Sequence, residues 1–298
     1  MLLTGARGFV GSEVLRQLLA SGHEVVAVSR NLRAENVPPG VMQVAADITG
    51  DNWQRWCEGC GAAIHLVGII REVPRAGATF ERAHVVATRR VIAACKALGI
   101  RRVVHMSALG TRAEAATPYH RTKWQGEEVV RASGLDWTIF RPTPMFGPGD
   151  GFATTIARAM RRFPIFPVFG DGTYTVQPVA VEEVARCLVA VLERPVTIGE
   201  TYQLGGPEVL TYNEVLRRIA QALSLRRAFV HVPVGLARLA VSIIQHFPGA
   251  PITRDQLTML LEGATCDVSA VSLTFGVPAA RFQGPLWLRQ EKRAEGNR

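Results

Sequence analysis

Three glycines spaced three residues apart near the start of the chain constrain its fold more than any other feature. Gly5, Gly8 and Gly11 separate a short apolar segment, Met1–Leu3, which predicts a strand, from a segment with Val and Leu at helical spacing, which predicts a helix. In that setting Gly5 permits the turn, Gly8 lets the backbone approach a phosphate, and Gly11 lets the helix pack on the strand. Glycines at this spacing can also serve a tight turn alone. The flanking strand and helix favour a dinucleotide pyrophosphate at the helix N-terminus.

Length, charge and cysteine content exclude several other classes. The 298 residues suffice for one large α/β domain and a smaller one. The net charge of +9 comes from dispersed arginine pairs, which argues against nucleic-acid binding, although an anionic cofactor, an acidic partner or an anionic membrane surface could use the excess. Five cysteines without a repeating spacing indicate reduced thiols; Cys57 and Cys60 are interpreted as a buried pair, and we expect no metal. With no long apolar span and a glycine turn directly at the N-terminus, we expect a cytoplasmic protein.

Strand and helix patterns alternate along the first half of the chain. The helices are clearest at Phe80–Leu98 and Tyr119–Ala132, each closed by a glycine. Because near-continuous apolar strands alternate with helices, the predicted fold class is α/β, a Rossmann doubly wound parallel sheet covered on both faces. The predicted strands are Met1–Leu3, Glu24–Val28, Met42–Ala45, Ala62–Val67, Arg102–Ser107 and Trp137–Phe140.

The pattern changes after Pro142, where prolines and glycines form a stiff, turning segment. Between Gly235 and His246 apolar residues recur at helical spacing, which indicates either core packing or a helix that binds a partner or a membrane surface. Residues 289–298 are mostly polar and charged, and we expect them to fray. Later helices are predicted at Val181–Glu193, from near Thr211, and from a capping box at Thr253 and Gln256 to Gly263.

The end of the second predicted strand sets the expected cofactor preference. Where NAD-binding proteins of this architecture place an acid for the ribose 2′-hydroxyl, this chain has Ser29 followed by Arg30. Nothing there repels a 2′-phosphate, and Arg30, with Arg7 close to the same corner, can bind it. NADP(H) is therefore preferred over NAD(H). Asp47 ends the third strand, where it can accept a hydrogen bond from the adenine amino group or serve a plain turn.

The candidate catalytic pair is Tyr119 and Lys123, which share one helical face at i, i+4 spacing. An ammonium near a phenol favours the phenolate and is expected to lower the pKa of Tyr119 from about 10 toward neutrality, which makes it a general acid/base. The same lysine can hold the nicotinamide ribose. The alternative is an exposed lysine beside a packed tyrosine, but the pair begins the helix directly after the fifth strand, where the nicotinamide is expected.

Taken in order, the motifs identify the chain as resembling the short-chain dehydrogenase/reductase superfamily, in its extended or atypical, epimerase/dehydratase-like branch. Within it, the chain is most similar to the accessory NADPH-binding subunit of respiratory complex I and its stand-alone bacterial relatives, through Ser107-Ala-Leu-Gly110, Tyr119-x-Arg-x-Lys123 and Pro251-x-Thr-Arg-Asp-Gln256. The superfamily motifs cover nearly the whole chain: Thr4-Gly-Ala-Arg-Gly-Phe-Val-Gly11, Asp47, His65-Leu-Val-Gly68, Tyr119 with Lys123, Arg141-Pro142, Phe146-Gly-Pro-Gly-Asp150, Gly170-Asp-Gly172 and Gln177-Pro-Val-Ala-Val-Glu-Glu-Val184.

The resemblance implies a discontinuous layout. Residues 1–142 and about 173–196 would form the NADP(H)-binding Rossmann domain, and about 143–172 and 197–298 a smaller α/β substrate-binding domain with a polar C-terminal tail. It also implies a set of cofactor-binding residues: Gly5, Arg7, Gly8, Phe9, Val10, Gly11, Ser29, Arg30, Asp47, Ile48, Leu66, Val67, Gly68, Lys123 and Pro142.

One departure from the superfamily pattern concerns catalysis. Related dehydrogenases place a catalytic Ser or Thr just beyond the fifth strand, and that position falls on Ala108 here. Because side chains alternate along a strand, Ser107 would point to the other face. Either Ser107 or Thr111 substitutes, or the group that polarises the carbonyl is missing. We interpret three buried-looking histidines as packing residues: His65, His84, which stands where Asn is usual, and His105.

Two classes of function remain open from the sequence. The first is an enzyme that transfers hydride between the nicotinamide and a carbonyl or hydroxyl compound, with Tyr119 exchanging the proton. The second is a protein that holds NADPH as part of a structure or assembly, like the complex I subunit, in peripheral contact with a membrane or a respiratory complex. The sequence does not identify the small-molecule substrate or the oligomeric state.

Overall fold

The computed structural model describes residues 1–31, 37–50, 52–247, 250–276 and 280–288. The expected fraying of residues 289–298 lies outside this range. The described chain divides into two compact units. The first comprises Met1–Pro142, Glu182–Leu204 and the helix α9 (Ser269–Phe275), and the second comprises Thr143–Val181, Gly205–Val268 and the described residues near the C-terminus.

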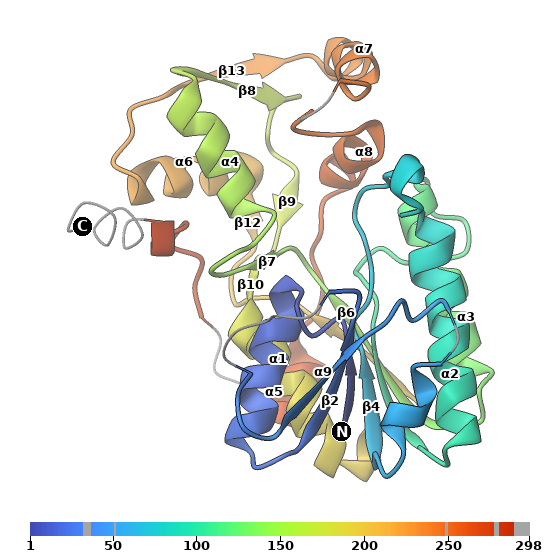
Figure 1. Cartoon of the computed structure of the whole chain (residues 1–298). Helices are drawn as coiled ribbons and strands as arrows, with labels where there is room; N and C mark the ends of the chain where they lie inside the picture. Colours follow the sequence, from blue (N-terminus) through green and yellow to red (C-terminus); the bar gives the residue numbers. More distant parts are fainter. Residues whose placement is uncertain (32–36, 51, 248–249, 277–279, 289–298) are drawn as a thin grey trace. The chain divides into compact units, whose positions relative to one another are not determined.

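The first unit is built on one seven-stranded, fully parallel sheet, in the order β11-β6-β5-β4-β1-β2-β3 (Figure 1). This confirms the predicted Rossmann α/β fold. The first strand of the chain lies inside the sheet, so its side chains are buried on both faces. The strands are β1 (Leu2–Thr4), β2 (Val25–Ser29), β3 (Val41–Ala45), β4 (Ala62–His65), β5 (Arg102–Met106), β6 (Asp136–Pro142) and β11 (Glu200–Leu204).

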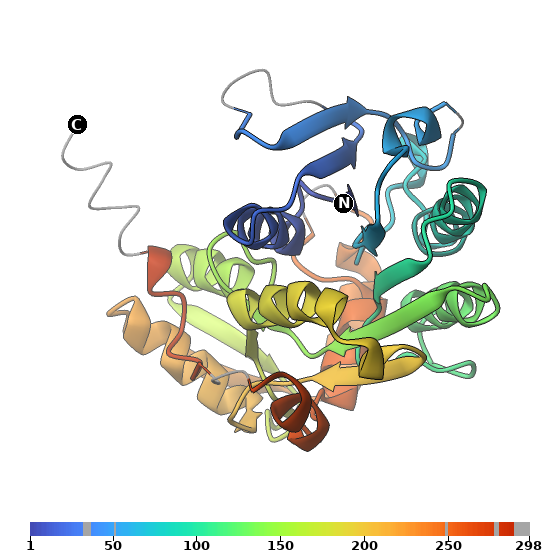
Figure 2. The same cartoon turned by 90° about the horizontal axis from the view of Figure 1, so that it is seen from below.

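Helices cover both faces of this sheet, as Figures 1 and 2 show. On one face lie α1 (Phe9–Ala20) and α5 (Val181–Ala190), and on the other α2 (Ala87–Ala97) and α3 (Pro118–Arg131). The core between the sheet and α2 and α3 contains Trp53, three cysteines and aliphatic residues from six strands; the cysteines are Cys57, Cys60 and Cys95. Short helical turns complete the unit at Gln54–Cys57, Pro74–Ala76, Val191–Glu193 and Pro195–Thr197.

The predicted helix Phe80–Leu98 starts as a π-helix, Glu81–Val86, before it continues as α2. At this turn α3 approaches very closely, since a Cβ on Gly126 would lie 2.6 Å from the carbonyl oxygen of His84. The Thr88 hydroxyl donates to that same oxygen over 2.6 Å. The wide turn therefore places the His84 backbone between two helices, and π-turns of this kind are frequent at functional sites.

The second unit has short strands around its own core. Its strands form three two-stranded pairs, and its aromatic and aliphatic core includes Phe146, Met160, Tyr212 and Phe282. The predicted capping box is present, with Thr253 and Gln256 opening α8 and Gly263 following its end. The elements are β7 (Met145–Phe146), α4 (Ala153–Arg162), β8 (Ile165–Phe169), β9 (Thr175–Val176), β10 (Val179–Ala180), β12 (Leu210–Thr211), α6 (Tyr212–Ala222), β13 (Ala228–Val232), α7 (Val234–Ile244) and α8 (Arg254–Glu262).

The unit boundaries differ from those predicted from the sequence. The segment returning to the sheet was placed at about 173–196, but β9 and β10 pair with strands of the second unit, and β11 pairs with β6 from Glu200 opposite Thr138 to Leu204 opposite Pro142. The helix α9 joins the first unit as well, because Phe275 packs 5.8 Å from Phe140 and 5.3 Å from Tyr202, measured between ring centroids. In the part of the chain that is described, no helix is long and apolar enough to cross a membrane.

Candidate dinucleotide and catalytic site

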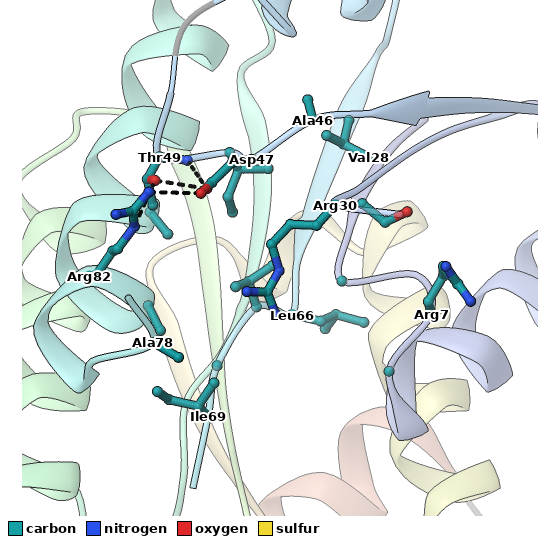
Figure 3. Close-up of a pocket in the computed structure, with 18 of the residues that line it drawn as sticks. Arg7, Val28, Arg30, Ala46, Asp47, Thr49, Leu66, Ile69, Ala78 and Arg82 are labelled. Carbon is teal, nitrogen blue, oxygen red and sulfur yellow. Dashed lines mark hydrogen bonds and ion pairs between the residues drawn. The ribbon is translucent and has the colours of Figure 1, made fainter. Parts of the chain in front are cut away.

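A cleft of about 430 Å³ opens at the carboxyl ends of β1, β2, β3 and β4 in the first unit (Figure 3). In doubly wound sheets this edge is where ligands bind. Ten residues of the predicted cofactor set line it: Gly5, Arg7, Gly8, Ser29, Arg30, Asp47, Ile48, Leu66, Val67 and Gly68. The other predicted members lie outside its lining: Phe9, Val10 and Gly11 in the first turn of α1, Lys123 in α3 and Pro142 at the end of β6.

The glycine turn has the geometry that a pyrophosphate site requires. Gly5 has a φ of +80°, and a Cβ there would lie 3.2 Å from the backbone of Leu66 and Val67. A Cβ on Gly11 would lie 2.0 Å from the Gly5 carbonyl oxygen, so only glycine lets α1 approach the turn this closely. Gly8 is the N-cap of α1 and offers no side-chain cap, and the first turn carries no acid. The N–H groups of that turn therefore suit an anion.

Among the described residues, the ribose corner of the cleft carries arginines and no acid beside them. Arg7 Nη1 and Ser29 Oγ both donate to the Asn31 carbonyl oxygen, over 2.7 and 2.8 Å. Arg30 is exposed, and Figure 3 shows its side chain extending into the cleft between Asp47 and Leu66. Among the described lining residues Asp47 is the sole carboxylate.

The Asp47 carboxylate accepts hydrogen bonds from Thr49 and Arg82, an arrangement that the sequence did not predict. Its Oδ1 accepts from the backbone N–H and the hydroxyl of Thr49, and its Oδ2 lies 2.8 Å from Nη2 of Arg82 (Figure 3). Burial alone would raise the pKa of Asp47, but the Thr49 and Arg82 hydrogen bonds outweigh it and lower the pKa. Arg82 also donates from Nε to the Thr49 hydroxyl over 3.1 Å. No local motif marks Arg82, because the π-helix that presents it is distant in sequence.

Lys123 lies where β4 and β5 end. The N-cap hydroxyl of Thr117 accepts from the backbone N–H of His120 and starts α3, which carries Lys123 inward. The buried ammonium donates to the Met106 carbonyl oxygen over 3.0 Å, and a Cβ on Gly68 would lie 3.0 Å from Nζ. Burial lowers the pKa of Lys123 to about 8. Gly68 thus borders both the cleft and the lysine.

The Tyr119 ring is surrounded by other rings, and its pKa does not follow the sequence prediction. Ring centroids of Phe80, His84 and His120 lie 5.7, 5.4 and 5.1 Å from that of Tyr119, all in edge-on orientations. Burial raises the pKa of Tyr119 to about 12. The predicted lowering by Lys123 is wrong for this structure, because the ammonium is directed to the Met106 carbonyl and burial dominates at the phenol.

The two candidate hydroxyls for carbonyl polarisation lie together. Ser107 directly follows β5, and its hydroxyl is 3.3 Å from that of Thr111. Both side chains are buried. The structure therefore brings Ser107 and Thr111 into one pair and does not single out either of them.

The three histidines that were interpreted as packing residues are buried, and burial lowers the pKa of each. His84 Nδ1 lies 2.9 Å from the Thr122 hydroxyl, which itself donates to the Pro118 carbonyl, so Nδ1–H donates and Nε2 can accept from the Ile69 N–H at 3.2 Å. Burial and the Lys123 charge lower the pKa of His84 to about 2. His65 and His105 stack 5.3 Å apart in neighbouring strands, as packing residues.

The buried pair predicted at Cys57 and Cys60 bears on whether this unit contains a metal site. Cys57 and Cys60 are buried, and burial raises the pKa of the Cys57 thiol to about 12. Within the described ranges no group of three His, Cys, Asp or Glu side chains is placed to hold a metal ion. The described site is therefore organised around backbone N–H groups, arginines and the Tyr119–Lys123 pair.

Comparison with known proteins identifies the family. The model of the NAD dependent epimerase/dehydratase family matches residues 1–205, and the chain belongs to this family. The superfamily resemblance read from the motifs is thereby confirmed.

Two curated relatives illustrate the range within the family. The chain is 28% identical over 247 residues to the mitochondrial NADH dehydrogenase (ubiquinone) 1 alpha subcomplex subunit 9 of Arabidopsis thaliana, which covers 78% of this chain and 60% of that protein. It is 27% identical over 237 residues to the ceramide reductase of Caulobacter vibrioides, covering 78% of this chain and 73% of the relative. The chain thus spans about 60% of the length of the plant subunit.

Solved structures agree with the fold. MoeE5, in complex with UDP-glucose and NAD, superposes with a TM-score of 0.76 at 23% identity, covering 100% of this chain and 99% of that chain. DesIV, a dTDP-glucose 4,6-dehydratase from Streptomyces venezuelae with NAD and TYD bound, superposes with a TM-score of 0.76 at 22% identity, covering 99% and 98%. At these identities the likeness concerns the fold alone.

Replacing Gly8 tests whether the turn cradles a pyrophosphate. A valine at this position keeps an ordinary φ of −73°, and its Cβ would lie 3.3 Å from the Gly5 carbonyl oxygen, a contact that a small shift relieves. Gly8→Val should leave the far-ultraviolet circular dichroism spectrum unchanged and abolish NADPH binding in calorimetry, since the side chain occupies the phosphate position. Gly61→Val, at an open position before β4, is the matched control. Undiminished binding by Gly8→Val would contradict the assignment.

Proposed function

We propose that the protein is an NADP(H)-dependent oxidoreductase that interconverts a carbonyl and a hydroxyl group, with Tyr119 as general acid/base. One observation carries the proposal. Gly68 lines the dinucleotide cleft and also lies against Nζ of Lys123, whose helix presents Tyr119 one turn earlier. A nicotinamide at that end of the cleft would therefore meet the tyrosine and the lysine together.

In the proposed reaction the cofactor carries the hydride, and the side chains of the site transfer the proton and position the reactants. When bound, the nicotinamide supplies or accepts the hydride. Tyr119 donates a proton to the substrate oxygen as the carbonyl carbon is reduced, and takes it back in oxidation. With a pKa raised to about 12, the Tyr119 phenol is protonated at neutral pH, which is the state that a proton donor requires. Lys123 anchors the ribose, and Ser107 or Thr111 polarises the carbonyl.

The preference for NADP(H) rests on charge in the ribose corner. Arg30 points into the cleft, Arg7 lies at its other side, and Asp47, the one carboxylate among the lining residues that the structure describes, is already bound to Arg82. A 2′-phosphate would meet an unopposed guanidinium, whereas a 2′-hydroxyl would find no acid to receive it.

The relatives suggest a substrate class. Ceramide reductase, and the 2-alkyl-3-oxoalkanoate reductase of Stenotrophomonas maltophilia, 26% identical over 261 residues, are named for reductions of compounds with alkyl chains. We therefore propose an aliphatic, lipid-like ketone as the substrate class for this chain.

A second candidate function is that of an NADPH holder within an assembly. Two observations favour it: the hydroxyl expected at Ala108 is displaced to Ser107, and Lys123 is engaged with the Met106 carbonyl while the phenol of Tyr119 has a raised pKa. Relatives named as complex I subunits are consistent with this role. In a holder the bound nucleotide would stabilise the fold by mass action without turnover.

The cofactor preference is tested by Arg30→Ala. The wild-type chain should bind NADPH more tightly than NADH in calorimetry. Loss of a charge-assisted phosphate contact should weaken NADPH binding by about tenfold to a hundredfold and leave NADH binding nearly unchanged. Arg89→Ala, an exposed arginine of α2 outside the cleft, serves as the control. Equal wild-type affinities for the two nucleotides would contradict the preference.

Turnover distinguishes the enzyme from the holder. With a panel of aliphatic ketones, Tyr119→Phe should keep NADPH affinity and lower the rate of NADPH oxidation by about 10²–10⁴-fold, because it removes the proton and keeps the ring. Lys123→Ala should weaken both binding and rate. Tyr202→Phe, in β11, is the control.

If no ketone, aldehyde or nucleotide sugar oxidises NADPH, and nucleotide leaves the protein only on unfolding, the proposal of an enzyme fails and the holder stands. In that case NADPH should still raise the melting temperature of the protein, although no turnover is detected.

A further inference from the structure

A helix of the second unit exposes one apolar face while it packs with another. In α7, Ala237 and Val241 are buried and pack with Leu257 of α8. The opposite, outward residues remain accessible to solvent by 44–61%, in α7 and the turn after it: Leu236, Leu239, Ile243, Ile244 and Phe247. The α7 outer face is defined by these five residues, and its four residues before Phe247 belong to the apolar pattern seen in the sequence between Gly235 and His246. Core packing, one of the two interpretations of the sequence, accounts for the buried side of the helix and leaves the outer face unexplained.

The strand pair that precedes α7 also exposes apolar side chains. β8 and β13 pair in parallel, with Pro167 opposite Val230. Ile165 of β8 is 57% exposed, Val230 of β13 is 48% exposed, and Phe163, just before β8, is 53% exposed. Pro233 alone separates β13 from α7, and Figure 1 shows the helix at the end of that strand. Large exposed apolar areas of this kind mark interaction surfaces.

The two segments that form this surface contain arginines and no acid, although Asp171 and Asp255 directly follow them. Residues 152–170 and 224–254, which contain α4, β8, β13 and α7, include no Asp or Glu. The whole chain has 34 basic and 25 acidic residues, so acids are excluded here although they are common elsewhere. The basic side chains of the two segments are Arg158, Arg161, Arg162, Arg226, Arg227, Arg238 and Arg254.

We propose that the α7 outer face binds an anionic membrane surface, with Leu239 and Ile243 in the acyl region near the headgroups and the arginines on the phosphates. An interfacial helix with an apolar face and basic flanks binds such a surface by burial and by electrostatic attraction together. A second copy fits less well, because a two-fold interface would bring two arginine-rich rims together. Nucleic acid fits poorly as well, because the centre of the surface is apolar. The inference does not rest on the proposed activity.

Vesicle sedimentation with the full chain tests this surface. The protein should co-sediment with phosphatidylcholine vesicles containing about 30% phosphatidylglycerol, bind pure phosphatidylcholine vesicles much more weakly, and lose binding as salt rises. The paired variant Leu239→Ser/Ile243→Ser should weaken binding by at least about tenfold. Leu273→Ser on α9, 88% exposed and in the other unit, is the matched apolar control.

The charge contribution is tested separately. Arg162→Gln, Arg226→Gln and Arg238→Gln, all at exposed positions, should each weaken binding to anionic vesicles by about fivefold, and Arg89→Gln should not. NADPH binding and circular dichroism of every variant should match the wild type, which separates loss of the surface from loss of the fold.

Three results would overturn the proposal. The first is no binding to anionic vesicles, and the second is full binding by the paired serine variant. The third is a concentration-dependent dimer in light scattering that the paired variant abolishes while vesicle binding is absent, which would assign the face to a second copy.

Discussion

The close approach of α1 to the turn after β1 is the constraint on which the site depends. A Cβ on Gly11 would lie 2.0 Å from the Gly5 carbonyl oxygen, so glycine alone lets the helix start directly against the turn. That contact fixes the N-terminus of α1, which has no side-chain cap, at the carboxyl ends of the strands, beside the ends of β2 and β4. The cleft, its arginines and the neighbouring lysine all take their positions from this edge.

Sequence reasoning recovered what is encoded locally. The glycine turn, the Tyr119–Lys123 spacing and the capping box at Thr253 depend on neighbours in the chain, and the structure contains each of them. The return of β11 and α9 to the first unit was missed, because a five-residue strand and a seven-residue helix carry too little pattern to show which sheet they join. Arg82 was missed for a related reason: its partner Asp47 is brought to it only by the fold.

The pKa values of Tyr119 and Lys123 show most clearly what residue spacing in the sequence cannot predict. The i, i+4 relation placed Tyr119 and Lys123 correctly on one helix, yet their ionisation follows burial and not their proximity. Lys123 donates to the end of β5, and neutral histidines pack around the tyrosine. A protonated phenol beside a buried ammonium is suited to donating a proton to a reduced carbonyl, and it is equally stable in a protein that only holds its nucleotide. Family membership establishes the class of protein. Whether the protein is an enzyme or only holds its nucleotide depends on the chemistry around Tyr119 and Lys123.

We propose that the cleft of the first unit holds an NADP(H) molecule through the glycine turn and the arginine corner. The most direct test is mass spectrometry of the nucleotide released by denaturing the purified full chain, after incubation with equal NADPH and NADH and removal of free nucleotide. NADP(H) at close to one molecule per chain is the predicted result. Release of NAD(H) alone, or of no nucleotide from a folded protein, would contradict the account.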